Sequence, residues 1–332
     1  MNNSISLLLV IFFINSSTAL CETLKAVREK TDPSTGSNDI TFNHDFTKFL
    51  ISGFKKATIY DAASNTIERS FSADENVISA KFNFDGTKIV TVSENIAKIW
   101  NAQNGKSIQI LKHPGKVFSA SFSPDGNKIV TTSVLDPEEK WTSEHVIKVW
   151  DTNGHELKSI TGGYGFRPRT AIFSKDGTQL IVATASYNRI YNPETGAIIF
   201  EFGKDSDGHR NTVNSVNLNN DGDKIVTASV DKTAIIWDLS TRSLLHKLKT
   251  SGVMVLSASF SHDGSMVATA NFENAQIWDT QSGALLATIT GNINRINSAV
   301  FNKDGTKVYL VGIGNLGKDI KDILEIWQLL PK

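Results

Sequence analysis

The sequence predicts an all-β fold built from seven copies of one small antiparallel sheet. A tight turn centred on aspartate recurs along the chain, as in "SFSPDGNKIVTTS" at 121–133. Seven such aspartates follow one another at intervals of 40–51 residues: Asp45, Asp85, Asp125, Asp176, Asp221, Asp263 and Asp304. A second marker, an aromatic residue after β-branched residues, also occurs seven times: Tyr60, Trp100, Trp150, Tyr191, Trp237, Trp278 and Trp327. Because two independent markers give the same count, we expect seven repeats.

Each repeat contains four short strands. In the third repeat they span 116–123, 128–133, 146–151 and 156–160, and "PDGN" forms the first turn. Pro124 presets the φ that the turn requires, and Gly126 accepts the positive φ that ends it. The strands are nearly continuous apolar or Thr/Ser runs, which is typical of sheets buried on both faces. Four-stranded antiparallel sheets packed radially meet this condition, so we expect a seven-bladed β-propeller.

The ends of the chain predict how the ring closes. The last repeat stops at its third strand, "LEIWQLLPK", whereas "TLKAVRE" (23–29) precedes the first inner strand without a role of its own. We expect this N-terminal strand to complete the last blade, because closure removes the open sheet edges of the array.

The third strands resemble those of the Trp-Asp (WD) repeat family of β-propellers. The carriers are "IKVWDT" (147–152), "IIWDLS" (235–240) and "AQIWDT" (275–280), and the resemblance covers residues 23–330. The fifth repeat also has the Gly-His pair of the family, at 208–209. The resemblance implies a hydrogen-bonded structural brace formed by His209, Ser229, Asp231 and Trp237. Departures are tyrosine for tryptophan in repeats 1 and 4, Asp45-Phe46 for Asp-Gly, and "IWNA" in repeat 2.

The first 21 residues predict a signal peptide. They contain no charged side chain, and their apolar run is too short to span a bilayer. Small residues place the cleavage after Ala19 or after Cys21, although the segment lacks the usual Lys or Arg. An uncleaved anchor, a disordered start and a lipidated Cys21 are the alternatives. Residues 22–332 then form one propeller domain, without membrane insertion, in a secreted or periplasmic location.

Charge and motif content exclude several classes of function. The 34 Lys and Arg balance 34 Asp and Glu, which argues against nucleic acid as the partner and against a polybasic membrane anchor. The seven histidines lack metal-ligand spacing, and neither a nucleophile elbow nor a P-loop is present. We therefore predict no catalytic residues, no metal and no cofactor, and a monomer that is not an enzyme.

Three insertions predict where a partner binds. Extra residues occur at 135–146 and 312–323, between second and third strands, and at 203–210, between two blades. These connections emerge on one side of a propeller, because strands alternate in direction. Insertions on one face mark the binding face of a repeat protein. The alternative is neutral variation in surface loops, which tolerate changes in length.

Aromatic and arginine side chains are the usual interface anchors, and several fall on this face. The candidates, of which we expect about half to be exposed, are Phe54, Phe118, Trp141, Phe166, Arg167, Arg169, Tyr187, Arg210, Phe272 and Arg295. We predict an exported scaffold that binds an unidentified protein partner. The alternative is a propeller enzyme or small-ligand binder that uses the central channel, but the inner strands offer mostly Ser, Asn and Thr. A third reading is a cytosolic scaffold.

Overall fold

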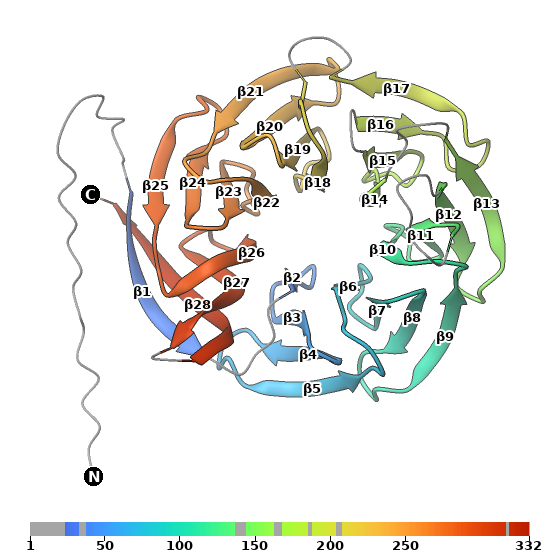
Figure 1. Cartoon of the computed structure of the whole chain (residues 1–332), viewed down its shortest axis with the longest axis horizontal. Helices are drawn as coiled ribbons and strands as arrows, with labels where there is room; N and C mark the ends of the chain where they lie inside the picture. The colour runs from blue at the N-terminus through green and yellow to red at the C-terminus, as the bar shows by residue number, and fades with distance from the viewer. Residues whose placement is uncertain are drawn as a thin grey trace.

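The computed structural model describes residues 24–32, 38–136, 144–162, 168–184, 188–203, 208–316 and 319–331, with only the backbone at 30–32, 316 and 319. Seven four-stranded antiparallel sheets stand around a common axis (Figure 1). The predicted seven-bladed β-propeller is therefore confirmed. The described residues contain no helix, and hence none that is long and apolar enough to cross a membrane.

The strands of each blade follow one another from the axis outward. Blade 1 consists of β2 (Asp39–Phe42), β3 (Lys48–Gly53), β4 (Lys56–Asp61) and β5 (Ile67–Ser72). Blade 2 consists of β6 (Ser79–Phe82), β7 (Lys88–Ser93), β8 (Ile96–Asn101) and β9 (Ser107–Lys112). Blade 3 consists of β10 (Val117–Phe122), β11 (Lys128–Val134), β12 (His145–Asp151) and β13 (Glu156–Thr161). Blades 4 and 5 consist of β14 (Thr170–Phe173), β15 (Leu180–Ala183), β16 (Asn188–Tyr191) and β17 (Ile198–Phe202); and β18 (Val213–Leu218), β19 (Lys224–Ser229), β20 (Thr233–Asp238) and β21 (Ser243–Lys249). Blades 6 and 7 consist of β22 (Val255–Phe260), β23 (Met266–Asn271), β24 (Ala275–Asp279) and β25 (Leu285–Ile289); and β26 (Ile293–Phe301), β27 (Lys307–Leu316), β28 (Asp319–Pro331) and β1 (Leu24–Asp32).

The aspartate turn joins the two inner strands of every blade. In blade 3 the Asp125 carboxylate accepts a hydrogen bond from Ser123 Oγ at 2.5 Å, and Gly126 has a φ of 70°. In blade 1 Phe46 replaces this glycine and still adopts a φ of 62°. A residue with a β-carbon rarely adopts that conformation. The Phe46 ring stacks on Phe42 with centroids 5.2 Å apart, a contact that offsets part of the strain.

The type of aromatic residue on each third strand correlates with the side chain that lies beside its ring on the second strand. In four blades the indole N–H donates to a threonine hydroxyl at 2.8–3.1 Å: Trp100 to Thr91, Trp150 to Thr131, Trp237 to Thr227 and Trp278 to Thr269. Blades 1 and 4 have Ile51 and Val182 at the threonine position, and they carry Tyr60 and Tyr191. Because a buried indole N–H needs an acceptor, the tyrosines of blades 1 and 4 agree with the absence of the threonine hydroxyl there.

The N-terminal strand completes the last blade, as predicted. β1 pairs antiparallel with β28, from Leu24 opposite Pro331 to Asp32 opposite Leu324. Blade 7 has Leu310 in place of the threonine, and the Trp327 indole N–H donates instead to Glu325 Oε2 at 3.0 Å. The other oxygen of this carboxylate accepts a hydrogen bond from Arg28 Nη1 of β1 at 3.2 Å. The fully buried Glu325 thus ties the first strand of the chain to the last.

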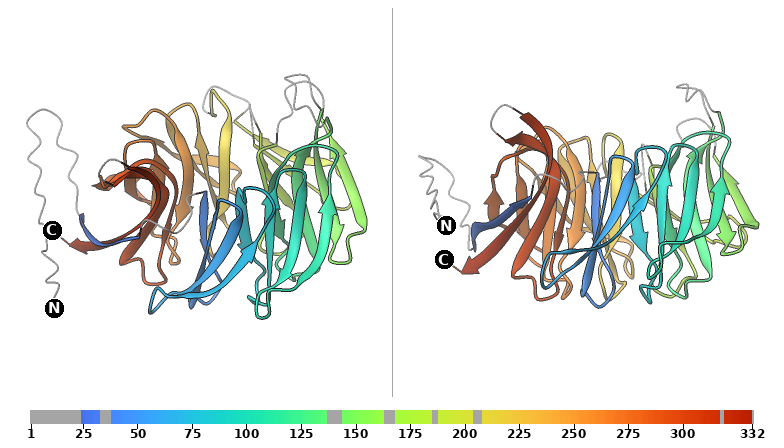
Figure 2. Two further views of the ribbon diagram at one scale, coloured as in Figure 1. Left: turned by 60° about the horizontal axis from the view of Figure 1, so that its bottom comes forward. Right: turned by 90° about the horizontal axis from the view of Figure 1, so that it is seen from below.

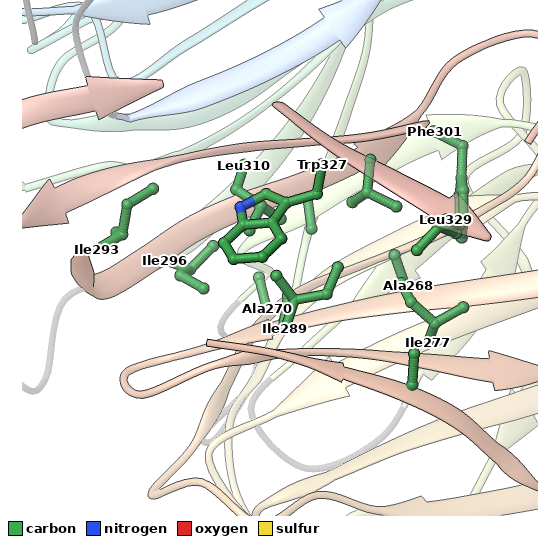
Figure 3. Packing of buried hydrophobic residues seen from close by; sticks show 14 of the residues in the cluster. Ala268, Ala270, Ile277, Ile289, Ile293, Ile296, Phe301, Leu310, Trp327 and Leu329 are labelled. Carbon is green, nitrogen blue, oxygen red and sulfur yellow. The ribbon is translucent and has the colours of Figure 1, made fainter. Parts of the chain in front are cut away.

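The hydrophobic core lies between the blades. Seven clusters of buried side chains each combine residues of two neighbouring blades, including one across the closure between blades 7 and 1. Between blades 6 and 7, the Trp327 ring lies among Ile296, Leu310 and Ile289 (Figure 3). Because every blade buries both faces against neighbours, the ring is stiff and its connections are the parts that vary.

The strand directions divide the connections between two faces, which Figure 2 shows at the upper and lower edges of the ring. We call the loop face the one that bears the second-to-third-strand turns and the blade-to-blade connections. The turn face bears the aspartate turns. Part of the insertion in repeat 7 extends β27 and β28 to 10 and 13 residues, with Leu316 opposite Asp319 as the last pair. This hairpin rises above the neighbouring strands on the loop face (Figure 2).

Candidate functional site

The loop face carries six of the ten predicted anchor residues within the described part of the chain. Phe54 is 69% exposed, and the side chains of Arg169, Arg210 and Arg295 are exposed. Phe118 and Phe272 are half-buried. The other four candidates lie outside the described residues: Trp141, Phe166, Arg167 and Tyr187.

Two arginine–phenylalanine pairs lie on this face, and each joins two blades. The Arg169 guanidinium of blade 4 lies over the Phe118 ring of blade 3, 4.7 Å from its centroid. His145 stacks nearly parallel to Phe118, with centroids 5.6 Å apart. The Arg295 guanidinium of blade 7 lies over the Phe272 ring of blade 6 at 5.1 Å. Blades 3 and 4 are opposite blades 6 and 7 in the ring, so the two pairs lie on opposite sides of the axis (Figure 1).

The β27–β28 hairpin adds an exposed apolar side chain that the sequence analysis did not single out. Ile320, next to the hairpin tip, is 76% exposed, which exceeds every other large apolar residue among those described. Two glycines let the hairpin base pack closely on β26: a Cβ at Gly312 would lie 2.0 Å from the Arg295 carbonyl oxygen, and one at Gly314 would lie 2.0 Å from that of Asn292. The hairpin is therefore a supported part of the loop face.

The brace of blade 5 uses a different hydroxyl from the one predicted. His209 Nδ1 lies 3.0 Å from Asp231 Oδ2, and its Nε2 lies 2.8 Å from Thr227 Oγ1, which also accepts the Trp237 indole N–H. Ser229 Oγ donates to the Asn211 carbonyl and accepts from the Asp231 backbone N–H at 3.0 Å, so it contacts the brace through Asp231, while Thr227 is the hydroxyl that His209 and Trp237 share. Thr227 and Ser229 point to the same side of β19, and Thr227 is the one level with the indole.

The brace also holds the turn between β19 and β20. Burial alone would raise the pKa of Asp231, but hydrogen bonds with His209 and Thr233 and from the Arg210 backbone N–H lower it below its usual value. The carboxylate therefore stays ionised and fully used as an acceptor. We assign this cluster to the support of the loop face, since none of its groups is left to act on a ligand.

We expect Thr227→Val to lower the free energy of unfolding by about 2 kcal/mol, because it leaves a buried indole N–H and a buried imidazole nitrogen without their shared partner. Thr91→Val in blade 2 is the matched control, since Thr91 accepts from the Trp100 indole without a histidine. Thr91→Val should lower the free energy of unfolding by about half as much as Thr227→Val. Urea unfolding of both variants checks this, and equal losses would show that the histidine contributes nothing.

Blade 3 contains a second histidine at the place of His209. His113 precedes Thr131 by 18 residues, as His209 precedes Thr227. Its Nδ1 lies 2.9 Å from Ser133 Oγ, and its ring lies edge-on to Trp150 with centroids 5.3 Å apart. Burial, together with the positive charge of Lys148, lowers the pKa of His113 to about 4. The imidazole is therefore neutral in the folded protein at physiological pH.

This pKa predicts a loss of stability in mild acid. A histidine whose pKa is lowered on folding binds fewer protons in the folded state, so stability falls as the pH drops from about 6.5 towards 4. We expect the free energy of unfolding to decrease by about 1–2 kcal/mol between pH 7 and pH 5 through His113. Urea titrations should show a smaller decrease in His113→Gln. The same decrease in both proteins would contradict the assignment.

Several polar side chains of the inner strands join neighbouring blades. Asn217 Nδ2 donates to the Ala258 carbonyl at 2.6 Å, and Ser259 Oγ donates to the Ala299 carbonyl at the same distance. These bonds run from blade 5 to blade 6 and from blade 6 to blade 7. The predicted Ser/Asn/Thr character of the axis therefore serves the cohesion of the ring.

Blades 1 and 2 place two charged side chains at the axis that the sequence analysis missed. Ser79 Oγ donates to Asp39 Oδ2 at 3.2 Å, and Ser298 also hydrogen-bonds to this carboxylate. Burial raises the pKa of Asp39 and lowers that of Lys81, and their mutual attraction opposes both shifts. Alignment of "NDITF" and "ISAKF" with the other inner strands would have revealed the pair.

Two other surfaces are alternative candidates for a binding site. A cavity of about 350 Å³ opens on the turn face between blades 1 and 2, where Thr47 and Thr87 hydrogen-bond to Asp45 and Asp85 and lower the pKa of both carboxyls. The outer strands of blades 1 to 4 expose apolar side chains: Ile67, Ile108, Ile110, Leu157, Ile198 and Ile199. Among the described residues, no three His, Cys, Asp or Glu side chains are grouped so as to hold a metal ion.

Comparison with known proteins agrees with the repeats seen in the structure. The family model for the WD domain, G-beta repeat, matches residues 105–151 and 201–238. Autophagy-related protein 16 of Arabidopsis thaliana is 26% identical over 52% of the chain and 34% of its own length. Nuclear distribution protein nudF of Aspergillus niger is 27% identical over 51% of the chain and 39% of its length. Apoptotic protease-activating factor 1 of Rattus norvegicus is 31% identical over 44% of the chain and 11% of its own length. The chain thus spans less than half the length of these relatives.

Proposed function

The chain belongs to the WD-repeat β-propeller family, and on that premise we propose that it is a non-enzymatic scaffold that binds a protein partner through its loop face. The observation that carries the proposal is the gathering of exposed Phe54 and Ile320 with two stacked arginine–phenylalanine pairs on one side of a closed ring. Aromatic and arginine side chains are the common anchors of protein interfaces.

The ring supports binding through pre-organisation. Side chains that are held before binding lose little conformational entropy when a partner docks. The Arg169 guanidinium is positioned over Phe118, which in turn stacks on the buried His145. The brace and the glycine-packed hairpin base hold other parts of the same face. These contacts therefore hold side chains of the loop face in fixed positions.

A role without catalysis is favoured by the state of the polar groups around the axis. Asp39 and Lys81 attract each other, and neighbouring Ser and Asn side chains hydrogen-bond to the adjacent blade. A general base needs a reachable substrate proton and a pKa near the working pH. No described group at the axis combines the two with a nucleophile, so binding accounts better for this geometry than chemistry does.

We also propose that the protein is exported. The predicted leader lies outside the described residues, and the predicted cleavage after Ala19 or Cys21 precedes the first residue of β1, Leu24. Cleavage would therefore leave the closing strand whole. N-terminal sequencing of the protein purified from its source should begin at Leu20 or Glu22. A chain that still begins at Met1 in the cytosolic fraction would contradict export.

Partner capture tests the binding face. We expect Phe54→Ser combined with Ile320→Ser to weaken co-purification of the native partner by at least about tenfold, since each substitution removes an apolar contact worth about 1 kcal/mol or more. The matched control is Phe84→Ser combined with Ile198→Ser, which alters exposed apolar residues of the turn face and the outer rim. Circular dichroism should show both variants folded. Loss of capture only in the control would place the interface elsewhere.

A further inference from the structure

The inner strands leave polar side chains at the border of the axis. We call axial ring the polar residues that occupy one equivalent position on the inner strands: Thr41, Lys81, Ser121, Asn217 and Ser259. All five are half-buried, whereas the residue that precedes each of them in its strand is buried. Neighbouring blades cover both faces of an inner strand, and the second strand of its own blade covers its outer edge. The accessible part of the axial ring therefore faces the axis.

Four members of the axial ring direct their hydrogen-bond donors away from the axis. Asn217 Nδ2 and Ser259 Oγ each donate to a backbone carbonyl of the next blade at 2.6 Å. The hydroxyls of Thr41 and Ser121 donate to the carbonyl of the following residue at 3.3 and 3.4 Å. A hydroxyl that donates its hydrogen still accepts through its lone pairs, as does the oxygen of a side-chain amide. What these side chains retain for the axis is therefore acceptor capacity.

Lys81 is the exception in the axial ring. Its ammonium carries only N–H donors, and it forms neither a hydrogen bond nor an ion pair with any residue in the described part of the chain. Burial lowers the pKa of Lys81, and the attraction of Asp39 opposes that shift. The Asp39 carboxylate itself accepts hydrogen bonds from Ser79, Ser298 and the Ile40 backbone N–H. The carboxylate is thus hydrogen-bonded, and the ammonium is not.

We propose that the axial ring binds a small polyhydroxy carboxylate, such as a sugar acid, with the ligand carboxylate on Lys81 Nζ. A carboxylate gives the ammonium a charge-assisted hydrogen bond that no described residue supplies. The ligand hydroxyls donate to the unused acceptors, such as Asn217 Oδ1 and Ser259 Oγ. Ile172 and Val300 occupy the equivalent position in blades 4 and 7 and offer apolar contact to the C–H groups of the ligand. This inference goes beyond the proposed function and does not depend on it.

Charge and hydrogen-bonding capacity favour this class over other small ligands. A phosphate group brings up to about two negative charges and few donors, so Asp39 and the ring acceptors oppose it. The ammonium of a free amino acid needs a carboxylate, but that of Asp39 is already bonded to Ser79 and Ser298. A neutral sugar leaves Lys81 without a counter-charge at hydrogen-bonding distance. The remaining alternative is that Lys81 only offsets the charge of Asp39, in which case the ring binds none of these ligands.

Isothermal titration calorimetry of the purified protein tests the site with D-gluconate as the probe. D-Gluconamide is the matched control ligand, because it keeps the hydroxyls and replaces the carboxylate by a neutral amide. We expect gluconate to bind with a Kd of about 1 mM or tighter, and gluconamide to bind at least about tenfold more weakly. This comparison uses the unaltered protein, so it does not depend on how a variant folds.

Two variants locate the bound carboxylate and hydroxyls. Lys81→Met removes the ammonium and should weaken gluconate binding at least about tenfold. Lys303→Met is the matched control, since it removes the same charge from an exposed side chain of the turn face, and its affinity should be unchanged. Ser121→Ala keeps Lys81 and removes one acceptor, so we expect about threefold weaker binding. Circular dichroism checks that each variant is folded, and if Lys81→Met is not, the gluconamide comparison and Ser121→Ala decide.

Several outcomes would overturn the proposal. They are the absence of gluconate binding up to about 10 mM, equal binding of gluconate by folded Lys81→Met and by the unaltered protein, and equal binding of gluconate and gluconamide. Tighter binding of inorganic phosphate or of glycine than of gluconate would assign the site to another ligand class. None of these measurements involves capture of a protein partner, so their failure leaves the proposed function in place.

Discussion

Removal of residues 1–32 is expected to lower the melting temperature by about 8 °C, which for a chain of this length corresponds to about 5 kcal/mol. The deletion removes the eight residue pairs between β1 and β28. It also leaves the fully buried Glu325 without the guanidinium of Arg28. An opened ring exposes the edge of β28, which is 13 residues long. Such an edge promotes aggregation, so light scattering should rise at the same time.

Two controls separate ring closure from a general effect of truncation. A chain that lacks only residues 1–21 keeps β1 and should melt like the mature protein. A synthetic peptide of residues 22–32, added to the chain without residues 1–32, should restore part of the lost stability because it can rebuild the outer strand. An unchanged melting temperature after the longer deletion would show that β1 does not hold the ring closed.

Arg28→Ala should have the second-largest effect, a loss of about 2–3 kcal/mol. Breaking a buried ion pair by removal of one partner leaves an uncompensated charge, which costs 3–5 kcal/mol when both partners are buried. The Glu325 side chain is fully buried, but that of Arg28 is 35% exposed, so we expect a smaller loss. The Asn292 backbone N–H and the Trp327 indole continue to donate to the carboxylate in the variant.

A double-mutant cycle with Glu325→Gln isolates the ion pair from the packing of the arginine stem. Glutamine keeps an oxygen near Trp327 and removes the charge, so Arg28→Ala should cost less than about 1 kcal/mol in this background. Urea unfolding of the four proteins gives the coupling energy. Equal costs of Arg28→Ala in both backgrounds would show that the charge of Glu325 plays no part in closure.

The fold was predictable because its signals are local and repeated. An Asp-Gly turn and a buried aromatic residue need only short segments of sequence to be recognised, and seven copies make each of them reliable. Closure was predictable because the last repeat lacked a fourth strand and the N-terminal segment 23–29 had no repeat of its own. The lock at Glu325 was not, because it depends on which residue faces Trp327. The absence of threonine at Leu310 is the signal that could have indicated it.

The candidate site was less predictable, because it depends on distances between blades. Ser229 and Thr227 point to the same side of one strand, and only the height of the indole decides between them. Asp39 and Lys81 lie on different repeats, and the sequence does not show that their charges interact. The length of the repeat 7 insertion was evident, whereas its extension of a hairpin that exposes Ile320 was not. The stacking of arginine on phenylalanine likewise joins neighbouring blades.

The central claim is that a protein partner docks on the loop face, and site-specific photo-crosslinking tests it most directly. A benzophenone amino acid is placed at Phe54 or Ile320 on the loop face, at Phe84 on the turn face, or at Ile198 on the outer rim, all of which are at least half exposed. After irradiation with the native partner present, the account predicts one crosslinked partner from the two loop-face positions and none from the others. Crosslinks from Phe84 or Ile198 without any from the loop face would contradict it.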